Sequence, residues 1–208
     1  MDSEQISKIL RSNEKTARIF KGCFPCDLMP NPSHLTYPTA LVVNLDSHQL
    51  KGSHWIAIYA YGKEREVIYF DSLALPVNSI IEEKFLNKFS RTIKNKKPYQ
   101  SIFEDTCGQH CICFIYFLSL GYTYNEYINY LERYPKSCDL FIEKIIKYLS
   151  IGFSLSSRFG ASGVGSIAST LTFSLATSFT SLAEEVFRGI VKYLMKMSEY
   201  PPPIIIDY

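Results

Sequence analysis

The sequence has little of what marks secreted, repetitive or extended proteins. Six cysteines in 208 residues are too few for a small fold stapled by disulfides. We find no internal repeat, and the first twenty residues show no apolar core of a signal peptide. We therefore expect an intracellular chain with free thiols. The net charge of +2 neither requires nor excludes a nucleic-acid partner.

Hydrophobic residues, by contrast, make up 47% of the chain and aromatic residues 14%, which is enough to build a core. The composition changes near residue 150. Residues 159–183 contain no charged side chain, ten Ser or Thr and three Gly. We therefore predict a globular domain at residues 1–150 and a C-terminal extension at residues 151–208.

The extension combines a Ser/Thr/Gly-rich segment, an amphipathic helix and a proline-rich tail. Such a combination suggests contact with a membrane or a partner protein.

The first part of the chain predicts an α+β fold, with a small mixed or antiparallel sheet flanked by helices. Ser3 is expected to cap the first helix. Alternating or β-branched runs predict strands, two of which form an antiparallel hairpin around residue 63. The predicted strands are 38–46, 54–62 and 64–72, and the predicted helices are 3–12, 78–96, 108–120 and 137–150.

Three cysteines lie within seven positions of the stretch DTCGQHCICF. Cys107 stands where the buried helix is predicted to begin, and the partial positive charge of a helix N-terminus favours a thiolate. Cys111 and Cys113 lie deeper in the apolar helix, where a free cysteine behaves as a small hydrophobe. Cys107 is therefore the candidate nucleophile, with a buried core residue as the alternative.

A nucleophilic thiol needs a base, and His54 is the histidine that the predicted hairpin mounts rigidly. His34 and His48 lie in loops, and His110 lies on the nucleophile's own helix. Asp71 ends the strand that follows His54. Because the start of one hairpin strand lies beside the end of the next, His54 and Asp71 should be neighbours at one sheet edge.

Three further residues are candidates for the site. The side-chain amide of Gln100, seven positions before Cys107, could join the backbone N–H of Cys107 in an oxyanion hole. Trp55 follows the candidate base and Gly108 follows the nucleophile, so both are candidates for the substrate cleft. An exposed loop glutamine and a core tryptophan are the competing interpretations.

The order of GSHW, YFDS, a glutamine and CGxxC resembles the adenovirus protease (adenain) family, which is related to SUMO-deconjugating proteases. The intervals from His54 to Asp71 and from Gln100 to Cys107 are similar to the adenoviral pattern, whereas the interval between Asp71 and Gln100 is shorter. The resemblance covers roughly the first 120 residues and continues more loosely to residue 149.

The resemblance implies a cysteine endopeptidase with a papain-like site at the N-terminus of the buried central helix. In it His54 is the base, Asp71 the orienting acid, Cys107 the nucleophile and Gln100 the oxyanion donor. No metal and no cofactor for the chemistry are implied. The implied substrates are capsid precursors cut at Gly-containing sites during particle maturation, in the nucleus or cytoplasm of a host and in the virion. The segment ASGVG in the extension resembles such a site, which suggests self-cleavage after Val164. A virus or virus-derived mobile element is the implied source.

Adenoviral relatives are assisted by DNA and by a peptide that joins the enzyme through a disulfide. Residues 74–106 contain no cysteine, so we do not expect disulfide-linked activation here. DNA contact and a solvated helix face are both compatible with a run that has six basic residues and no acid. The six are Lys84, Lys88, Arg91, Lys94, Lys96 and Lys97.

Three alternatives stay open at this point. A ubiquitin-like or SUMO deconjugating protease is the first, although such enzymes usually have Asp where this chain has Thr106. A non-catalytic zinc or redox module could use Cys23, Cys26, Cys107 and Cys111. A capsid or scaffold protein that has lost its activity is the third.

Overall fold

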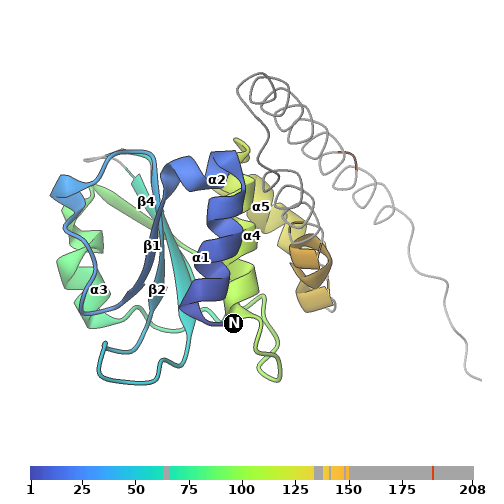
Figure 1. Cartoon of the computed structure of the whole chain (residues 1–208), viewed down its shortest axis with the longest axis horizontal. Coiled ribbons are helices and arrows are strands. Elements are labelled where there is room, and N and C mark those ends of the chain that lie inside the picture. The colour runs from blue at the N-terminus through green and yellow to red at the C-terminus, as the bar shows by residue number, and fades with distance from the viewer. Residues whose placement is uncertain (63–65, 134–137, 141, 148, 150–188, 190–208) are drawn as a thin grey trace, which may run out of the picture. The chain divides into compact units, whose positions relative to one another are not determined.

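The computed structural model divides the chain into two compact units, Met1–Ser150 and Ile151–Tyr208. It describes residues 1–62, 66–133, 138–140, 142–147, 149 and 189 (Figure 1). The predicted amphipathic helix, the cleavage after Val164 and the membrane or partner contact of the extension lie outside the described residues, Gly189 apart.

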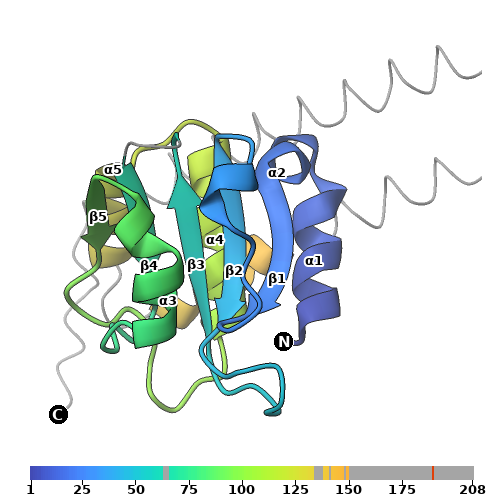
Figure 2. The ribbon, with the colours of Figure 1, turned by 90° about the vertical axis from the view of Figure 1, so that its left-hand side faces the viewer.

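The first unit has an α+β fold, as predicted, with a five-stranded mixed sheet and helices on both of its faces (Figure 1). Neighbouring strands follow the chain order, as Figure 2 shows. The outer pairs β1–β2 and β4–β5 are parallel, and the central pairs β2–β3 and β3–β4 are antiparallel. The strands are β1 (Phe20–Pro25), β2 (Thr39–Asn44), β3 (Trp55–Ala60), β4 (Glu66–Phe70) and β5 (Arg91–Lys94).

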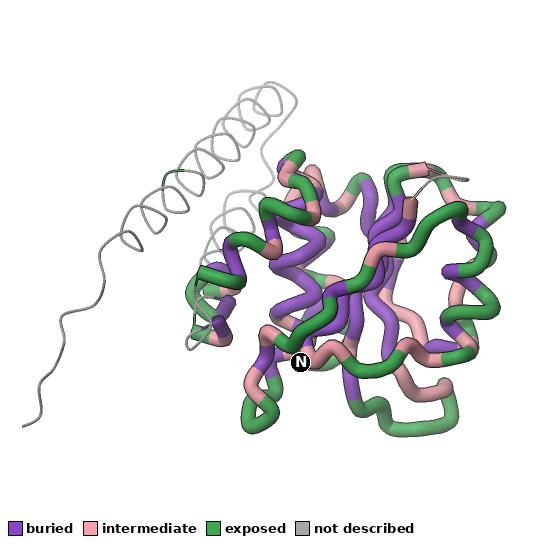
Figure 3. The backbone as a smooth tube through the Cα atoms, turned by 180° about the vertical axis from the view of Figure 1, so that it is seen from behind, coloured by how far each residue is buried: buried purple, intermediate pink, exposed green. Residues whose placement is uncertain are grey.

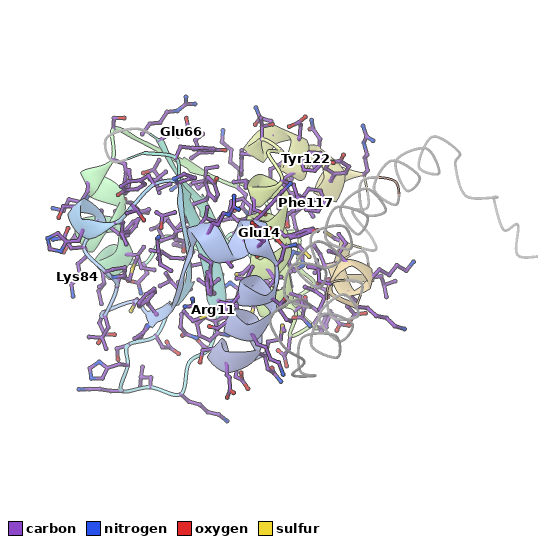
Figure 4. All side chains as sticks on the ribbon, turned by 45° about the horizontal axis from the view of Figure 1, so that its top comes forward. Arg11, Glu14, Glu66, Lys84, Phe117 and Tyr122 are labelled. Carbon is purple, nitrogen blue, oxygen red and sulfur yellow. The ribbon has the colours of Figure 1, made fainter. Side chains whose placement is uncertain are left out.

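The central strands are buried on both faces, which explains their nearly continuous apolar sequences. Leu41, Val43, Ile56 and Ile58 point to one face, where they form a core with Phe85 and its neighbours. That face is covered by α3 (Ser79–Lys84) and the 3-10 turn η2 (Leu86–Lys88). Figure 4 shows Lys84 of α3 and Phe117 of the central helix on opposite sides of the sheet.

The single helix predicted for residues 78–96 is wrong beyond Lys84. The helix α3 ends at Lys84, and the chain then forms η2 and the edge strand β5. Ile81, Phe85 and Phe89 are buried, but only Ile81 lies in α3, whereas Phe85 connects α3 to η2 and Phe89 follows η2. The β-branched Thr92 and Ile93 pair with β4 instead, because an open sheet edge outweighs a weak local helical preference.

The other face of the sheet carries α1 (Ser3–Ser12), α2 (Glu14–Ile19), α4 (Cys107–Ser119) and α5 (Tyr124–Glu132). The predicted buried helix is confirmed as α4, since ten of its thirteen residues are buried (Figure 3). Phe70 of β4 stacks on Phe114 of α4 with ring centroids 4.9 Å apart, and Tyr127 of α5 packs edge-on against both rings. This packing fixes α4 against the sheet.

Two details of the helices differ from or add to the prediction. The cap of α1 is Asp2, not Ser3, in a capping box with Gln5. Residues 138–140 and 142–147 are helical, as expected for the last helix of the domain. In the part of the chain that the structure describes, no helix combines the length and the apolar character needed to cross a membrane.

Candidate active site

The β3–β4 hairpin brings His54 and Asp71 together. His54 immediately precedes β3 and Asp71 immediately follows β4, so the antiparallel register places them side by side, as predicted. Nε2 of His54 lies 2.6 Å from Oδ1 of Asp71. Both side chains are buried, and Asp71 also accepts hydrogen bonds from the backbone N–H groups of Leu73 and Leu75. The carboxylate is therefore held in place independently of the imidazole.

Cys107 is the first residue of α4. The packing of α4 against the sheet places Cys107 at the end of the sheet where His54 lies. The half-buried thiol interacts with the His54 imidazole and with the backbone N–H groups of Trp55 and Gly108. Because Nε2 of His54 faces Asp71, Nδ1 is the ring nitrogen left for the thiol. The cap residue Thr106 makes no side-chain bond to the helix, so it does not compete for the N–H groups of the first turn.

The electrostatics of this pair favour a thiolate and an imidazolium. Burial works to lower the pKa of His54, but hydrogen bonds to Asp71 and Cys107 and their negative charges outweigh it and raise that pKa to about 9. Burial works to raise the pKa of Cys107, but the contacts with His54 and with two backbone N–H groups lower it overall. Each group thus stabilises the charged form of the other.

The structure describes all six cysteines of the chain, and Cys107 differs from the other five in the direction of its pKa shift. Burial is the largest influence on the other five and raises their pKa values, to about 12 for Cys138. Cys111 and Cys113 are fully buried in α4, so they remain neutral thiols. Among the described residues, no group of three or more His, Cys, Asp or Glu side chains is arranged to hold a metal ion.

Gln100 lies beside this site, but its side chain is already engaged. Its Oε1 accepts a hydrogen bond of 2.7 Å from the hydroxyl of Ser72, the residue after Asp71. Its Nε2 donates to the backbone carbonyl of Glu104. An amide nitrogen carries two hydrogens, of which this bond uses one. The interpretation of Gln100 as an exposed loop residue is wrong, because Gln100 is buried.

Trp55 and Gly108 both contact the N-terminal segment. The indole N–H of Trp55 donates to the carbonyl of Met1 at 3.1 Å. A Cβ atom on Gly108 would lie 3.1 Å from side-chain atoms of both Met1 and Ile6. The chain therefore approaches closely at the start of α4, which explains the glycine next to the thiol.

The loop before His54 depends on a glycine with φ of +88° at position 52. A Cβ there would lie 2.7 Å from Nδ2 of the buried Asn44. We expect Gly52→Ala to lower the free energy of unfolding by about 2–3 kcal/mol, because it adds a clash to the strain of a left-handed backbone. Urea unfolding measures this loss.

Gly121→Ala is the matched control for that substitution. Gly121 has φ of +90°, but nothing lies within 4 Å of its added Cβ. It should lose only about 1 kcal/mol, through backbone strain alone. Equal losses in the two variants would show that crowding against Asn44 does not shape the His54 loop.

A second histidine–aspartate pair supports the start of α4, and the sequence did not predict it. His110 is fully buried, and its Nε2 lies 3.1 Å from Oδ1 of Asp139. Asp139 also accepts a hydrogen bond from the Thr106 hydroxyl and one of 2.9 Å from the backbone N–H of Ser101. One carboxylate thus joins the loop before Cys107 to the helix that follows it.

Asp139→Ala is expected to lower the free energy of unfolding by about 3 kcal/mol. It leaves a buried imidazole, a hydroxyl and a backbone N–H without their acceptor, and each unpaired buried group costs about 1–3 kcal/mol. Chemical denaturation measures the loss, with Asp105→Ala as the control. Asp105 is exposed, so its replacement should change stability by less than about 0.5 kcal/mol. Similar effects of both substitutions would contradict a structural role for Asp139.

Two other residues of the site were missed. The side chain of Asn95 pairs with the backbone of Asp71 in both directions, at 3.0 Å from its N–H and 2.6 Å from its carbonyl. Ser72 orients Gln100 as described above. Ser72 could have been suspected from its place beside Asp71, whereas nothing local marks Asn95, because it directly follows β5 in a stretch that the sequence assigned to a helix.

The six basic residues considered for nucleic-acid contact do not line one helix. All are exposed, but they are spread over α3, η2, β5 and the residues after β5. Lys97 pairs with Glu132 at 2.7 Å, Arg91 pairs with Glu66 at 3.3 Å, and Lys84 donates to the carbonyl of Asp27. These residues thus belong to other elements than those that position Cys107 and His54.

Comparison with protein-family models and with curated proteins finds no match for this chain. The fold and the side-chain geometry therefore carry the functional argument.

Proposed function

We propose that the protein is a cysteine endopeptidase in which Cys107 is the nucleophile, His54 the base and Asp71 the acid that orients the base. The observation that carries this proposal is the position of one imidazole between a buried carboxylate and the single thiol with a lowered pKa. Groups with perturbed pKa values that share a site are typical of catalysis.

The arrangement supports acyl transfer in two steps. The Cys107 thiolate attacks a peptide carbonyl, and the protonated His54 gives its proton to the nitrogen as the carbon–nitrogen bond breaks. The amine leaves, and the acyl group stays on sulfur as a thioester. A water molecule then gives a proton to His54 and attacks the thioester, which releases the carboxylic product and restores the thiolate and imidazolium.

The negative oxygen of each tetrahedral intermediate needs hydrogen-bond donors. The backbone N–H of Cys107 lies at the N-terminus of α4, where the helix dipole also favours negative charge. The second hydrogen of the Gln100 amide is the other candidate donor. Because hydrogen bonds with Ser72 and Glu104 hold this amide in place, it needs little reorientation when negative charge develops on the substrate oxygen.

The resemblance to adenovirus proteases suggests the substrates: capsid precursors or similar proteins with glycine at the cleavage site. The close approach of Met1 and Ile6 to Gly108 is compatible with a narrow path beside the thiol, which glycine would pass most easily. SUMO-type deconjugation is the alternative use of the same site.

Cleavage-site profiling tests the proposed function. A peptide library derived from a digested proteome is incubated with the protein, and new carboxyl termini are identified by mass spectrometry. We expect termini after glycine with the wild type and none with Cys107→Ala. Cleavage of a SUMO fusion without cleavage of any peptide would favour deconjugation, and cleavage that survives Cys107→Ala would overturn the proposal.

A further inference from the structure

The loop between Gln100 and α4 exposes two large apolar side chains. Phe103 is 90% exposed and Ile102 is 80% exposed, more than any other exposed large hydrophobic residue of the described chain. Scattered exposed aliphatic residues are ordinary, but an adjacent aromatic and aliphatic pair displayed almost completely is not. The loop ends directly at Cys107.

This loop is fixed by hydrogen bonds of its own. The N–H of Phe103 donates to the Ser101 hydroxyl and the N–H of Glu104 donates to the Ser101 carbonyl. Asp139 binds both roots of the loop, through Ser101 and Thr106. The two apolar side chains are therefore presented by a preorganised backbone, so binding a partner there costs little conformational entropy.

The loop projects at the end of the domain where the thiol and imidazole lie. Figures 1, 2 and 3 show residues 101–106 and the loop that leads into His54 extending at the same end, close to the N-terminus. The second loop also carries an exposed apolar residue, Leu50, which is 63% exposed. Beside Phe103, the side chains of Glu104 and Asp105 are exposed and acidic.

We infer that residues 102–105 are a docking surface for the polypeptide substrate, which selects a segment with an apolar residue next to a basic one near the scissile bond. The inference rests on the proposed endopeptidase function and specifies its substrate class. The apolar residue would pack on Phe103 and Ile102, and the basic residue would face Glu104 and Asp105.

A substrate segment fits this surface better than a second copy of the chain does. A stable interface buries roughly 800 Å² on each partner, far more than two side chains at a loop tip provide. An extended substrate, in contrast, needs only one or two anchoring side chains beside the reacting bond. The acidic neighbours Glu104 and Asp105 also favour a basic partner. A symmetric contact between two copies would instead bring these acidic residues together, and their like charges would repel.

Two internally quenched peptides with a central Gly-Gly test the inference. One carries Leu-Lys three residues away on both sides of the centre, and the other carries Ser-Ser at those positions. We expect the wild type to show a kcat/KM about tenfold higher for the Leu-Lys peptide. Phe103→Ser should lower the ratio of the two values well below tenfold, because only Ile102 and the acidic pair then remain to favour Leu-Lys, whereas Tyr61→Ser should keep it. Tyr61 is 40% exposed and lies at the opposite end of β3.

A charge reversal tests the polar half of the surface. The double variant Glu104→Lys, Asp105→Lys should prefer a Leu-Glu peptide over the Leu-Lys peptide, which reverses the preference of the wild type. Thermal unfolding confirms that each variant is folded.

The outcomes separate the inference from the proposed function. If the wild type cuts neither peptide and no peptide in the profiling library, the proposed function fails. If peptides are cut but Phe103→Ser keeps the tenfold ratio, the docking surface alone is overturned. Sedimentation that shows a wild-type dimer and a monomeric Phe103→Ser variant would assign the surface to a second copy and would also overturn it.

Discussion

Replacing Cys107 with alanine is expected to lower kcat/KM for peptide cleavage by about 10⁴-fold or more. The substitution removes the proposed nucleophile, and enzymes whose catalytic groups act as a unit typically lose this much activity when one group is deleted. Cys107 is half-buried at the helix start, so the loss should come without unfolding. Initial rates on the Gly-Gly peptides, together with thermal unfolding, measure both effects.

Cys113→Ala is the control for this prediction. Cys113 lies six residues further along α4, fully buried, with its thiol directed to the carbonyl of Ile142. Its replacement should cost about 1–2 kcal/mol of stability through the small cavity it leaves, and should leave the cleavage rate within a few-fold of wild type. If Cys113→Ala were inactive and Cys107→Ala active, the nucleophile would have been assigned to the wrong thiol.

His54→Ala is expected to slow alkylation of Cys107 by iodoacetamide about tenfold or more at pH 6.5. Iodoacetamide reacts with the thiolate, and without the imidazolium the pKa of Cys107 returns toward about 8.5, where only about 1% is ionised at that pH. The wild-type rate should rise as the pH passes through the lowered pKa of Cys107 and then level off. Mass spectrometry of Cys107 peptides over a pH series measures these rates.

His48→Ala provides the comparison for that experiment. His48 pairs with Asp27 at 2.6 Å, but it is exposed and belongs to the loop before β3. Its removal should not change the alkylation profile of Cys107. Equal profiles for wild type and His54→Ala would contradict the thiol–imidazole pair.

The pH dependence of cleavage follows from the same two groups. Activity should rise with pH as Cys107 loses its proton, and should fall as the pH rises through about 9, where His54 loses the proton that the leaving amine needs. The stability that the charged His54 contributes to the folded state is lost over the same pH range. Because its pKa is raised in the folded state, that contribution is complete below about pH 6.5 and is lost as the pH passes through about 9.

The contact between His54 and Asp71 could be predicted because one local rule fixes it. Two alternating runs around a short tip form a hairpin, and its register puts the start of one strand beside the end of the next. The start of α4 could be predicted in the same way, because an apolar run from Cys111 to Leu118 follows shortly after Cys107 and Gly108. These are short-range patterns, and the structure keeps all of them.

The missed parts depend on contacts between segments that are far apart in the chain. Residues 91–94 have an ordinary helical pattern and become a strand only because the edge of β4 is open. Asp139 meets His110 and Thr106 across about thirty residues, and nothing in its own helix indicates that partner. The engagement of Gln100 by Ser72 likewise follows from the packing of two loops.

The pKa of His54 tests the central claim most directly. Nuclear magnetic resonance of the labelled imidazole, followed from pH 5 to pH 11, should give a pKa of about 9 in the wild type. Cys107→Ser should lower it, because the negative sulfur no longer stabilises the imidazolium. A wild-type pKa near 6.5 that is unchanged in Cys107→Ser would contradict the account, since it would mean that the thiol and the imidazole do not act as a pair.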